Sequence, residues 1–131
     1  MNADQTVLEA LKTVPKSLAA GVVDLDSGFL LAVKTTESHP QEILDFVSAA
    51  TKEMFEGENV TVVESLFKKV RGVTSDERYF KEIVVTSKNL LHYFGRSGKN
   101  ERIILCVVTQ TDANLGLVML KSKALAKELT V

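Results

Sequence analysis

ILCVVTQTDANLGLVMLKSKALAKEL, residues 104–129, joins two kinds of hydrophobic pattern. Its first part belongs to the most apolar run of the chain, residues 102–110, which predicts a central strand. Apolar residues then recur at helical spacing, and Asp112 is expected to cap a final helix. The stretch therefore predicts a buried strand followed by a helix that packs on the sheet. The expected inner face of this helix consists of Leu115, Val118, Met119, Leu125 and Leu129.

Two more apolar runs lie near the N-terminus, within SLAAGVVDLDSGFLLAV, residues 17–33. Asp26 and Gly28 between them predict a hairpin, because glycine can take the positive φ that a tight return needs. The runs are nearly continuous, which is typical of strands covered on both faces. A helix containing Val7 and Leu11 precedes them and is expected to end before Pro15.

Two helical segments and two strands are expected in the middle of the chain. Ser38 begins a central helix, residues 40–56, and Gln41 can complete a capping box. Thr61 and Glu64 predict a second capping box and a short helix over residues 62–71, which Gly72 ends. The following strands are expected within residues 79–87 and 89–95. The element order predicts an α/β (α+β) protein whose antiparallel sheet is covered by helices.

Composition and net charge exclude some classes of function. The chain has 131 residues and a formal net charge of −1, so it has no broad positive field for nucleic acid or membrane surfaces. One domain, 1–131, is expected. Cys106 is the only cysteine, which fits a reducing compartment. The N-terminal residues are not expected to be a signal peptide, no apolar run of roughly 18 residues occurs, and a cytoplasmic protein without membrane insertion is expected.

The segment GRSGKN, residues 95–100, contains the residue types of a phosphate-binding loop. A P-loop would place its first glycine at position 93, which is Tyr93, and Ser or Thr at position 100, which is Asn100. A strand rather than a helix is expected to follow it. The sequence therefore predicts a polar hairpin loop in which Gly95 and Gly98 turn the chain, without a bound cofactor.

No catalytic or metal-binding pattern is present. His39, His92 and Cys106 lack the spacing of a metal site, and Asp24 and Asp26 are expected to be turn residues. Cys106 is expected to be a small buried hydrophobic residue. An enzyme built around His92 and Cys106 is a hypothesis that full function of an alanine double mutant would remove. The sequence predicts no enzyme, no catalytic residue, no cofactor and no metal.

Three segments and the element order resemble the roadblock family, the dynein light-chain-like proteins. The segments are LAAGVVDLDSGFLLAV, EIVVTSKNLLHYF and the C-terminal stretch quoted first. The resemblance implies a profilin-like roadblock fold, with a five-stranded antiparallel sheet, the central helix on one face and the terminal helices on the other. Residues 57–78, with the short helix, depart from the family as an insertion.

The resemblance also implies a homodimer in which the central helix and the third strand of each subunit meet. Some apolar residues of the central helix, such as Leu44, lie outside its main apolar stripe. Such residues are expected where a partner covers a second side of the helix. The candidate dimer residues are Leu44, Val47, Thr51, Phe55, Tyr79, Lys81 and Ile83. Basic residues crowd the end of the short helix, and the candidate partner-contact residues there are Phe67, Lys68, Lys69 and Arg71.

Similar proteins are non-enzymatic platforms, and several bind Ras-like small GTPases and adjust their nucleotide cycle. The resemblance thus implies a homodimeric regulatory module or scaffold for protein–protein interaction. The alternative is a small-molecule sensor with a pocket between sheet and helix, for which the short helix would be a lid.

Overall fold

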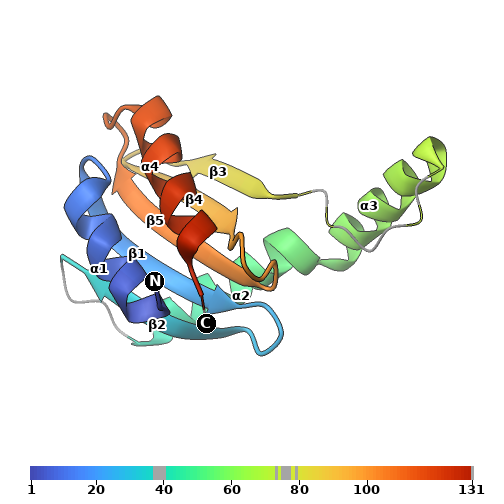
Figure 1. Ribbon diagram of the computed structural model, residues 1–131, viewed down its shortest axis with the longest axis horizontal. Coiled ribbons are helices and arrows are strands. Elements are labelled where there is room, and N and C mark those ends of the chain that lie inside the picture. The colour runs from blue at the N-terminus through green and yellow to red at the C-terminus, as the bar shows by residue number, and fades with distance from the viewer. Residues whose placement is uncertain (37–40, 73, 75–77, 79, 131) are drawn as a thin grey trace.

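The computed structural model describes residues 1–36, 41–72, 74, 78 and 80–130, apart from the side chains of 41–46. Five strands form one antiparallel sheet in the order β2-β1-β5-β4-β3. The strands are β1 (Ser17–Asp24), β2 (Phe29–Thr35), β3 (Glu82–Thr86), β4 (Leu90–Arg96) and β5 (Ile103–Gln110). The predicted five-stranded antiparallel sheet is confirmed, and the run 102–110 supplies its central strand (Figure 1).

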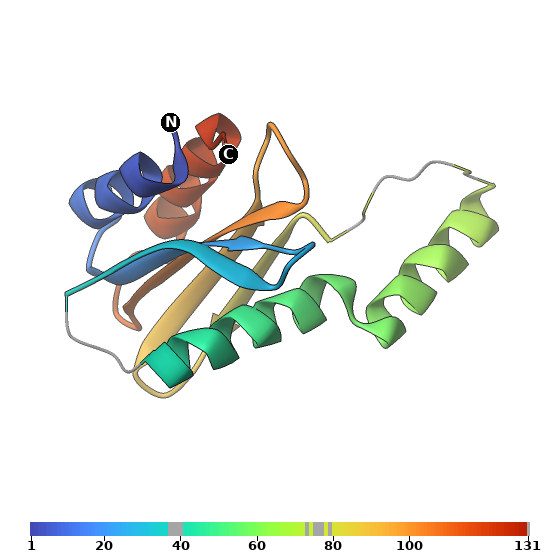
Figure 2. The ribbon, with the colours of Figure 1, turned by 90° about the horizontal axis from the view of Figure 1, so that it is seen from below.

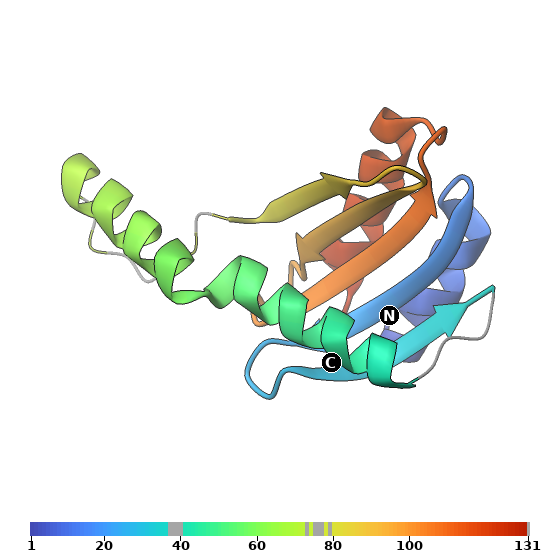
Figure 3. The same ribbon diagram turned by 180° about the vertical axis from the view of Figure 1, so that it is seen from behind.

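Helices cover both faces of this sheet, as predicted. Helices α1 (Ala3–Thr13) and α4 (Leu115–Glu128) lie side by side on one face, and α2 (Gln41–Glu56) crosses the other (Figure 2). Helix α3 (Glu58–Arg71) follows α2 after a bend and extends away from the sheet (Figure 3). The molecule therefore consists of a layered body and one projecting helical arm.

The two faces of β5 build two separate clusters of buried side chains. Leu105 and Val107 pack toward α1 and α4 with residues such as Val118. Ile104 and Cys106 pack on the opposite face with Phe55 of α2. Because side chains alternate along a strand, covering both faces requires an unbroken apolar run. This is why residues 102–110 have the most hydrophobic sequence of the chain.

The final helix begins two residues later than the sequence predicts. Its N-cap is Asn114, whose Oδ1 accepts a hydrogen bond from the Leu117 amide at 3.1 Å. Asp112, the predicted cap, instead accepts a hydrogen bond from Lys16 Nζ at 2.6 Å, which lowers the pKa of the Asp112 carboxyl. The prediction was wrong because Asp112 pairs with Lys16, which is distant in sequence, and Asn114 caps the helix instead.

The second helix of the middle segment is longer than predicted and its capping box is absent. It begins at Glu58 rather than at residue 62, and its N-cap is Gly57. The Thr61 hydroxyl donates to the Glu58 carbonyl at 2.9 Å, and the Glu64 carboxylate bonds to Arg78. Gly72 ends the helix with φ of 69°, as predicted. The assignment of residues 57–78 as an insertion in a single domain stays a prediction.

Other boundaries differ modestly. Strand β3 begins at Glu82, whereas the sequence predicts a strand over 79–87. The predicted cap at Ser38 lies outside the described residues. None of the helices in the described part of the chain is both long and apolar enough to span a membrane.

Candidate functional site

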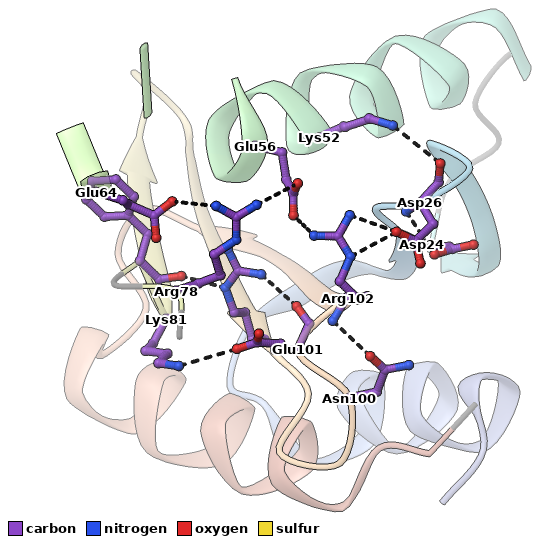
Figure 4. A network of polar contacts seen from close by, with 12 residues as sticks. Asp24, Asp26, Lys52, Glu56, Glu64, Arg78, Lys81, Asn100, Glu101 and Arg102 are labelled. Atoms are coloured by element: carbon purple, nitrogen blue, oxygen red, sulfur yellow. Dashed lines mark hydrogen bonds and ion pairs between the residues drawn. The ribbon is translucent and has the colours of Figure 1, made fainter. Parts of the chain in front are cut away.

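A network of ion pairs surrounds the bend between α2 and α3 (Figure 4). Glu56, the last residue of α2, pairs with Arg78 at 3.2 Å and also with Arg102. Arg102 reaches Asp26 of the β1–β2 turn at 2.8 Å. Lys52 of α2 donates to the carbonyl of the same Asp26 at 3.4 Å. The network therefore fixes the end of α2 to the β1–β2 turn and to the segment before β5.

The same network holds α3 by a buried carboxylate. Glu64 is only 2% exposed, and its Oε1 lies 3.2 Å from Arg78 Nη1. A buried carboxylate requires such a partner, because an unpaired charge away from water is strongly unfavourable. Pairing of Glu64 with Arg78 thus favours the rotation of α3 in which Glu64 lies on its buried side.

This rotation turns the apolar side of α3 toward solvent. Glu64 is the buried residue of the helix, whereas aliphatic residues on the other side are exposed. The exposed fractions are 51% for Val62, 39% for Val63, 57% for Leu66 and 85% for Val70. We call these four residues the α3 stripe. A shallow hollow of about 260 Å³ lies beside it, lined by Thr61, Val62, Ser65, Leu66 and Lys69.

The predicted partner-contact residues all lie on α3. Phe67 is 51% exposed, Lys69 and Arg71 are exposed, and Lys68 is half-buried. The three basic residues occupy the last turn, where positive charge suits the helix dipole. They therefore form a basic tip on the arm, and its contact with a partner stays a prediction.

The predicted dimer residues do not form one continuous surface. Thr51 and Phe55 have no exposed area, because they pack inside the subunit. Val47 is 39% exposed, and Ile83 is half-buried on β3. Exposed Lys81 lies 3.6 Å from Glu101. The side chains of Leu44 and Tyr79 lie outside the described residues.

Strand β3, which the dimer prediction includes, lies at an edge of the sheet. In the part of the chain that the structure describes, it pairs with β4 on one side, and no strand pairs with it on the other. The edge of a sheet presents backbone donors and acceptors that another strand can pair with. Val85 on this strand is 40% exposed.

The GRSGKN segment has no free amide for a phosphate among Ser97, Gly98, Lys99 and Asn100. The Ser97 and Gly98 amides donate to the carbonyls of Ile103 and Ala126, at 2.8 and 3.0 Å. The Lys99 and Asn100 amides both donate to Ser97 Oγ, at 3.0 and 3.2 Å. The prediction that this is a loop rather than a phosphate cradle is therefore supported by its internal hydrogen bonds.

The two glycines of this segment are needed for close packing, which corrects their predicted role. Gly95 lies within β4, and neither Gly95 nor Gly98 has a positive φ. A Cβ on Gly95 would lie 2.3 Å from the hydroxyl of Tyr93, which donates to Glu82 at 2.6 Å. A Cβ on Gly98 would lie 2.9 Å from the carbonyl of Lys127. Both glycines therefore allow neighbouring groups to approach the backbone.

A cavity of about 560 Å³ lies between this loop, the end of the sheet and α4. Four lysines and two glutamates contribute to its lining, together with Arg96 and Tyr93. These lysines and glutamates are Lys81, Glu82, Lys99, Glu101, Lys123 and Lys127. Charged residues therefore make up most of the residues that line it.

His92 and Cys106 do not form an activated pair. His92 stacks on Phe94, with ring centroids 6.3 Å apart, and Cys106 lies opposite Phe94 in the β4–β5 register. Burial raises the pKa of the Cys106 thiol to about 12, so the nucleophilic thiolate is disfavoured. No cluster of three or more His, Cys, Asp or Glu suited to a metal ion occurs among the described residues.

Sequence reasoning did not find the arginines that organise this end of the molecule. Besides Arg78 and Arg102, Arg96 donates to the carbonyls of Phe80 and Glu101, at 2.7 and 2.6 Å. Its guanidinium carbon lies 4.9 Å from the centre of the Phe55 ring. Burial lowers the pKa of Arg96, and the nearby Glu101 opposes this shift. No local pattern predicts these contacts, since the partners are distant in sequence.

Comparison with known proteins agrees with this architecture. No family model matches the sequence, and no curated protein matches it significantly. Among solved structures, "MglB with tetrameric arrangement" has 24% identity and a TM-score of 0.67, over 94% of this chain and 81% of that one. The roadblock/LC7 domain from Streptomyces avermitilis has 16% identity and a TM-score of 0.66, over 97% and 93%.

The chain has the roadblock/LC7 fold. A third structure, the gliding protein mglB from Thermus thermophilus, has 23% identity and a TM-score of 0.66, over 94% of this chain and 82% of that one. The resemblance to the roadblock proteins is thus confirmed at the level of the fold. At these identities the likeness shows the fold alone.

Proposed function

We propose that this chain is a non-enzymatic, homodimeric regulatory or scaffolding module of the cytoplasm that binds a Ras-like small GTPase and modulates its nucleotide cycle. The observation that carries the proposal is the roadblock/LC7 fold with an open β3 edge. Of the similar structures, one MglB has a tetrameric arrangement, and the Thermus protein is a gliding protein. The tetrameric arrangement of that MglB supports the proposed assembly of this chain with further copies.

The dimer would form through β3 and α2. Antiparallel pairing of β3 with its copy would continue the sheet across two subunits and satisfy both edges. Ile83 and the exposed Val85 would then become covered. Among the predicted dimer residues of α2 whose side chains are described, exposed Val47 would take part in the same contact.

The GTPase would contact the basic tip of α3. Lys68 and Arg71 lie on the side of α3 away from the α3 stripe, whereas Phe67 and Lys69 border the stripe on opposite sides. Positive charge at a projecting tip favours a partner with an acidic surface. The nucleotide would belong to the partner, because the amides of residues 97–100 are occupied within this chain.

Two measurements test this proposal. Sedimentation velocity at micromolar concentration is expected to show a dimer that Ile83→Arg converts to a monomer, because a charge at the pairing edge opposes burial. Affinity capture from the native extract, with a GTP analogue or GDP, is expected to retain a GTPase in one nucleotide state only. Lys68→Glu with Arg71→Glu should abolish that retention.

Matched controls separate charge from position. Lys12→Glu with Lys121→Glu reverses two exposed lysines on α1 and α4 and should leave GTPase retention unchanged. A strictly monomeric wild-type chain would contradict the dimer. Retention of non-GTPase proteins alone would favour a scaffold and contradict GTPase regulation.

The small-molecule sensor is the second candidate, favoured by the cavity of about 560 Å³ beside α4. Its lysines would select a small anionic ligand. A screen of nucleotides and phosphorylated metabolites by thermal denaturation tests it, since a ligand that binds only the folded chain raises Tm. A shift that Lys123→Glu removes would support the sensor, and no shift with any compound would contradict it.

A further inference from the structure

The α3 stripe is an apolar surface on a helix that stands apart from the body of the domain (Figure 3). Helix α3 has 14 residues, which corresponds to a length of about 21 Å. At the angular step of an α-helix, Val62, Val63, Leu66 and Val70 fall within an arc of about 100°. An arc of this width is what a helix presents to a packed neighbour, yet these residues are 39–85% exposed.

The charges beside the stripe indicate which neighbour fits. Glu58 and Lys69 are both exposed and lie on the same side of the stripe, next to Val62. They lie near opposite ends of the helix, about 16 Å apart along its axis. When two copies of one helix pack antiparallel, each flank faces the same flank of the other copy. Glu58 of each copy would therefore lie near Lys69 of the other, twice in one symmetric contact.

Parallel packing of the same helix is disfavoured. It would bring the basic tips of the two copies together, with Lys68, Lys69 and Arg71 repelling their equivalents. The acidic first turns would likewise meet at Glu58. The stripe and its flanking charges are thus self-complementary in the antiparallel orientation only.

We propose that α3 pairs antiparallel with α3 of a second copy of this chain, about a two-fold axis that passes between Val63 and Leu66. Such a contact is isologous, since the same surface of both copies takes part. It covers the α3 stripe, leaves Lys68 and Arg71 on the outer side and places Phe67 at the border of the contact. The inference does not depend on GTPase binding or on the β3 dimer.

The size of the contact defines its place in an assembly. Stable interfaces cover about 800 Å² on each partner and involve about 20 residues or more. One face of a 14-residue helix is smaller. The α3 pair alone is therefore a weak contact. In a chain that also dimerises through β3, it would be a second contact, which joins one dimer to another. Two isologous contacts on different surfaces link dimers into tetramers or longer assemblies.

Site-specific cross-linking tests the pairing directly. A residue next to a two-fold axis lies close to its own copy, so Leu66→Cys is expected to give a disulfide-linked dimer under mild oxidation. Leu120→Cys is the matched control, because Leu120 is a 64% exposed leucine on α4, a helix of the same length. Cys106 is 5% exposed and should not contribute. Equal cross-linking of both variants, or none at position 66, would overturn the proposal.

Charge reversal tests the orientation. In the Leu66→Cys background, Glu58→Lys or Lys69→Glu alone should slow cross-linking about three- to tenfold, because each places like charges together twice. The double reversal should restore the original rate. A double variant that is slower than either single variant would contradict the antiparallel orientation.

The outcome is separable from that of the proposed dimer. If Ile83→Arg yields a monomer by sedimentation while the Leu66→Cys cross-link persists at high concentration, both contacts are supported. If the wild-type chain is dimeric and position 66 never cross-links, the β3 dimer stands and the α3 pairing is wrong.

Discussion

Helices α3 and α4 have the same length, 14 residues, and opposite burial. Helix α4 lies on the sheet and buries aliphatic residues such as Val118 and Leu125, which are 0% and 7% exposed. Helix α3 buries Glu64 and exposes its aliphatic residues. The difference shows that an amphipathic pattern identifies a helix without telling which side the fold covers. In α3 the buried side chain is an ion-paired carboxylate, and in α4 the buried side chains are mostly aliphatic.

The largest expected difference between the sheet core and the α3 arm is in the rate at which a cysteine thiol reacts. At pH 8 a cysteine introduced as Leu66→Cys should react with a thiol reagent about a thousandfold faster than Cys106, or more. Burial raises the pKa of Cys106 to about 12, whereas an exposed thiol titrates near about 8.5. Parallel labelling followed by mass spectrometry measures both rates.

The pH dependence of Cys106 has a defined sign. The folded chain holds the thiol proton more tightly than the unfolded chain, so this contribution to stability is complete below the ordinary cysteine pKa. It is lost as the pH rises from there toward about 12. Equal labelling rates at positions 66 and 106 in the native protein would contradict the burial of this face of β5.

The same substitution in the two helices should have very different effects on stability. Leu125→Ala is expected to lower the free energy of unfolding by about 2–5 kcal/mol, because it leaves a cavity between α4 and the sheet. Leu66→Ala should change it by no more than about 0.5 kcal/mol in dilute protein. Urea denaturation of both variants provides the comparison, and a loss of similar size in both would show that α3 packs on its own subunit.

Removal of the buried carboxylate should release the arm without unfolding the body. Glu64→Ala leaves Arg78 with Glu56 as its remaining partner, and a cost of about 1–3 kcal/mol is expected. Hydrogen exchange should accelerate within 58–71 and remain unchanged within 115–128. Glu53→Ala, at an exposed position of α2, is the control. Uniform acceleration across both helices would show that the network stabilises the whole fold.

The smallest effect concerns how α4 begins. Asn114→Ala should cost about 1 kcal/mol, because the Leu117 amide loses its acceptor at the start of α4. Asp112→Ala should cost clearly less, since Asp112 contacts Lys16 at the surface and is not the N-cap of the helix. Thermal denaturation of the two variants distinguishes them, and the reverse order would support Asp112 as the cap after all.

The sheet could be predicted because its signals are local. The apolar run 102–110 marks the central strand, since both of its faces must be covered. Gly28 marks the β1–β2 turn and has the expected positive φ, 75°. Such features depend on neighbouring residues in the sequence, and each was confirmed.

The errors arose where two local patterns compete or where a distant side chain decides. Thr61 and Glu64 have the spacing of a capping box, but Glu64 is engaged by Arg78 and the helix begins at Glu58. Asp112 and Asn114 are both suitable caps, and Lys16 engages the first of them. Sequence alone gives no means of choosing between them.

The candidate site was the least predictable part. Arg102 lies 46 positions from Glu56 and 76 from Asp26, so no spacing rule connects them. Phe55 was expected at a dimer surface because it lies off the main stripe of its helix, but Arg96 and the sheet enclose it within the subunit. Both results depend on how α2 crosses the sheet, which the sequence pattern does not specify.

The junction of the two chain ends has a mechanical consequence. The Met1 amino nitrogen donates to the Glu128 carbonyl at 2.8 Å, and the Thr130 amide donates to the Met1 carbonyl at 2.7 Å. Tension applied to the two ends would load these bonds first and then peel α1 and α4 from the sheet, one contact after another. We expect a molecule pulled in this way to yield at a lower force than one pulled along β5, because tension along β5 would shear many bonds of the sheet together.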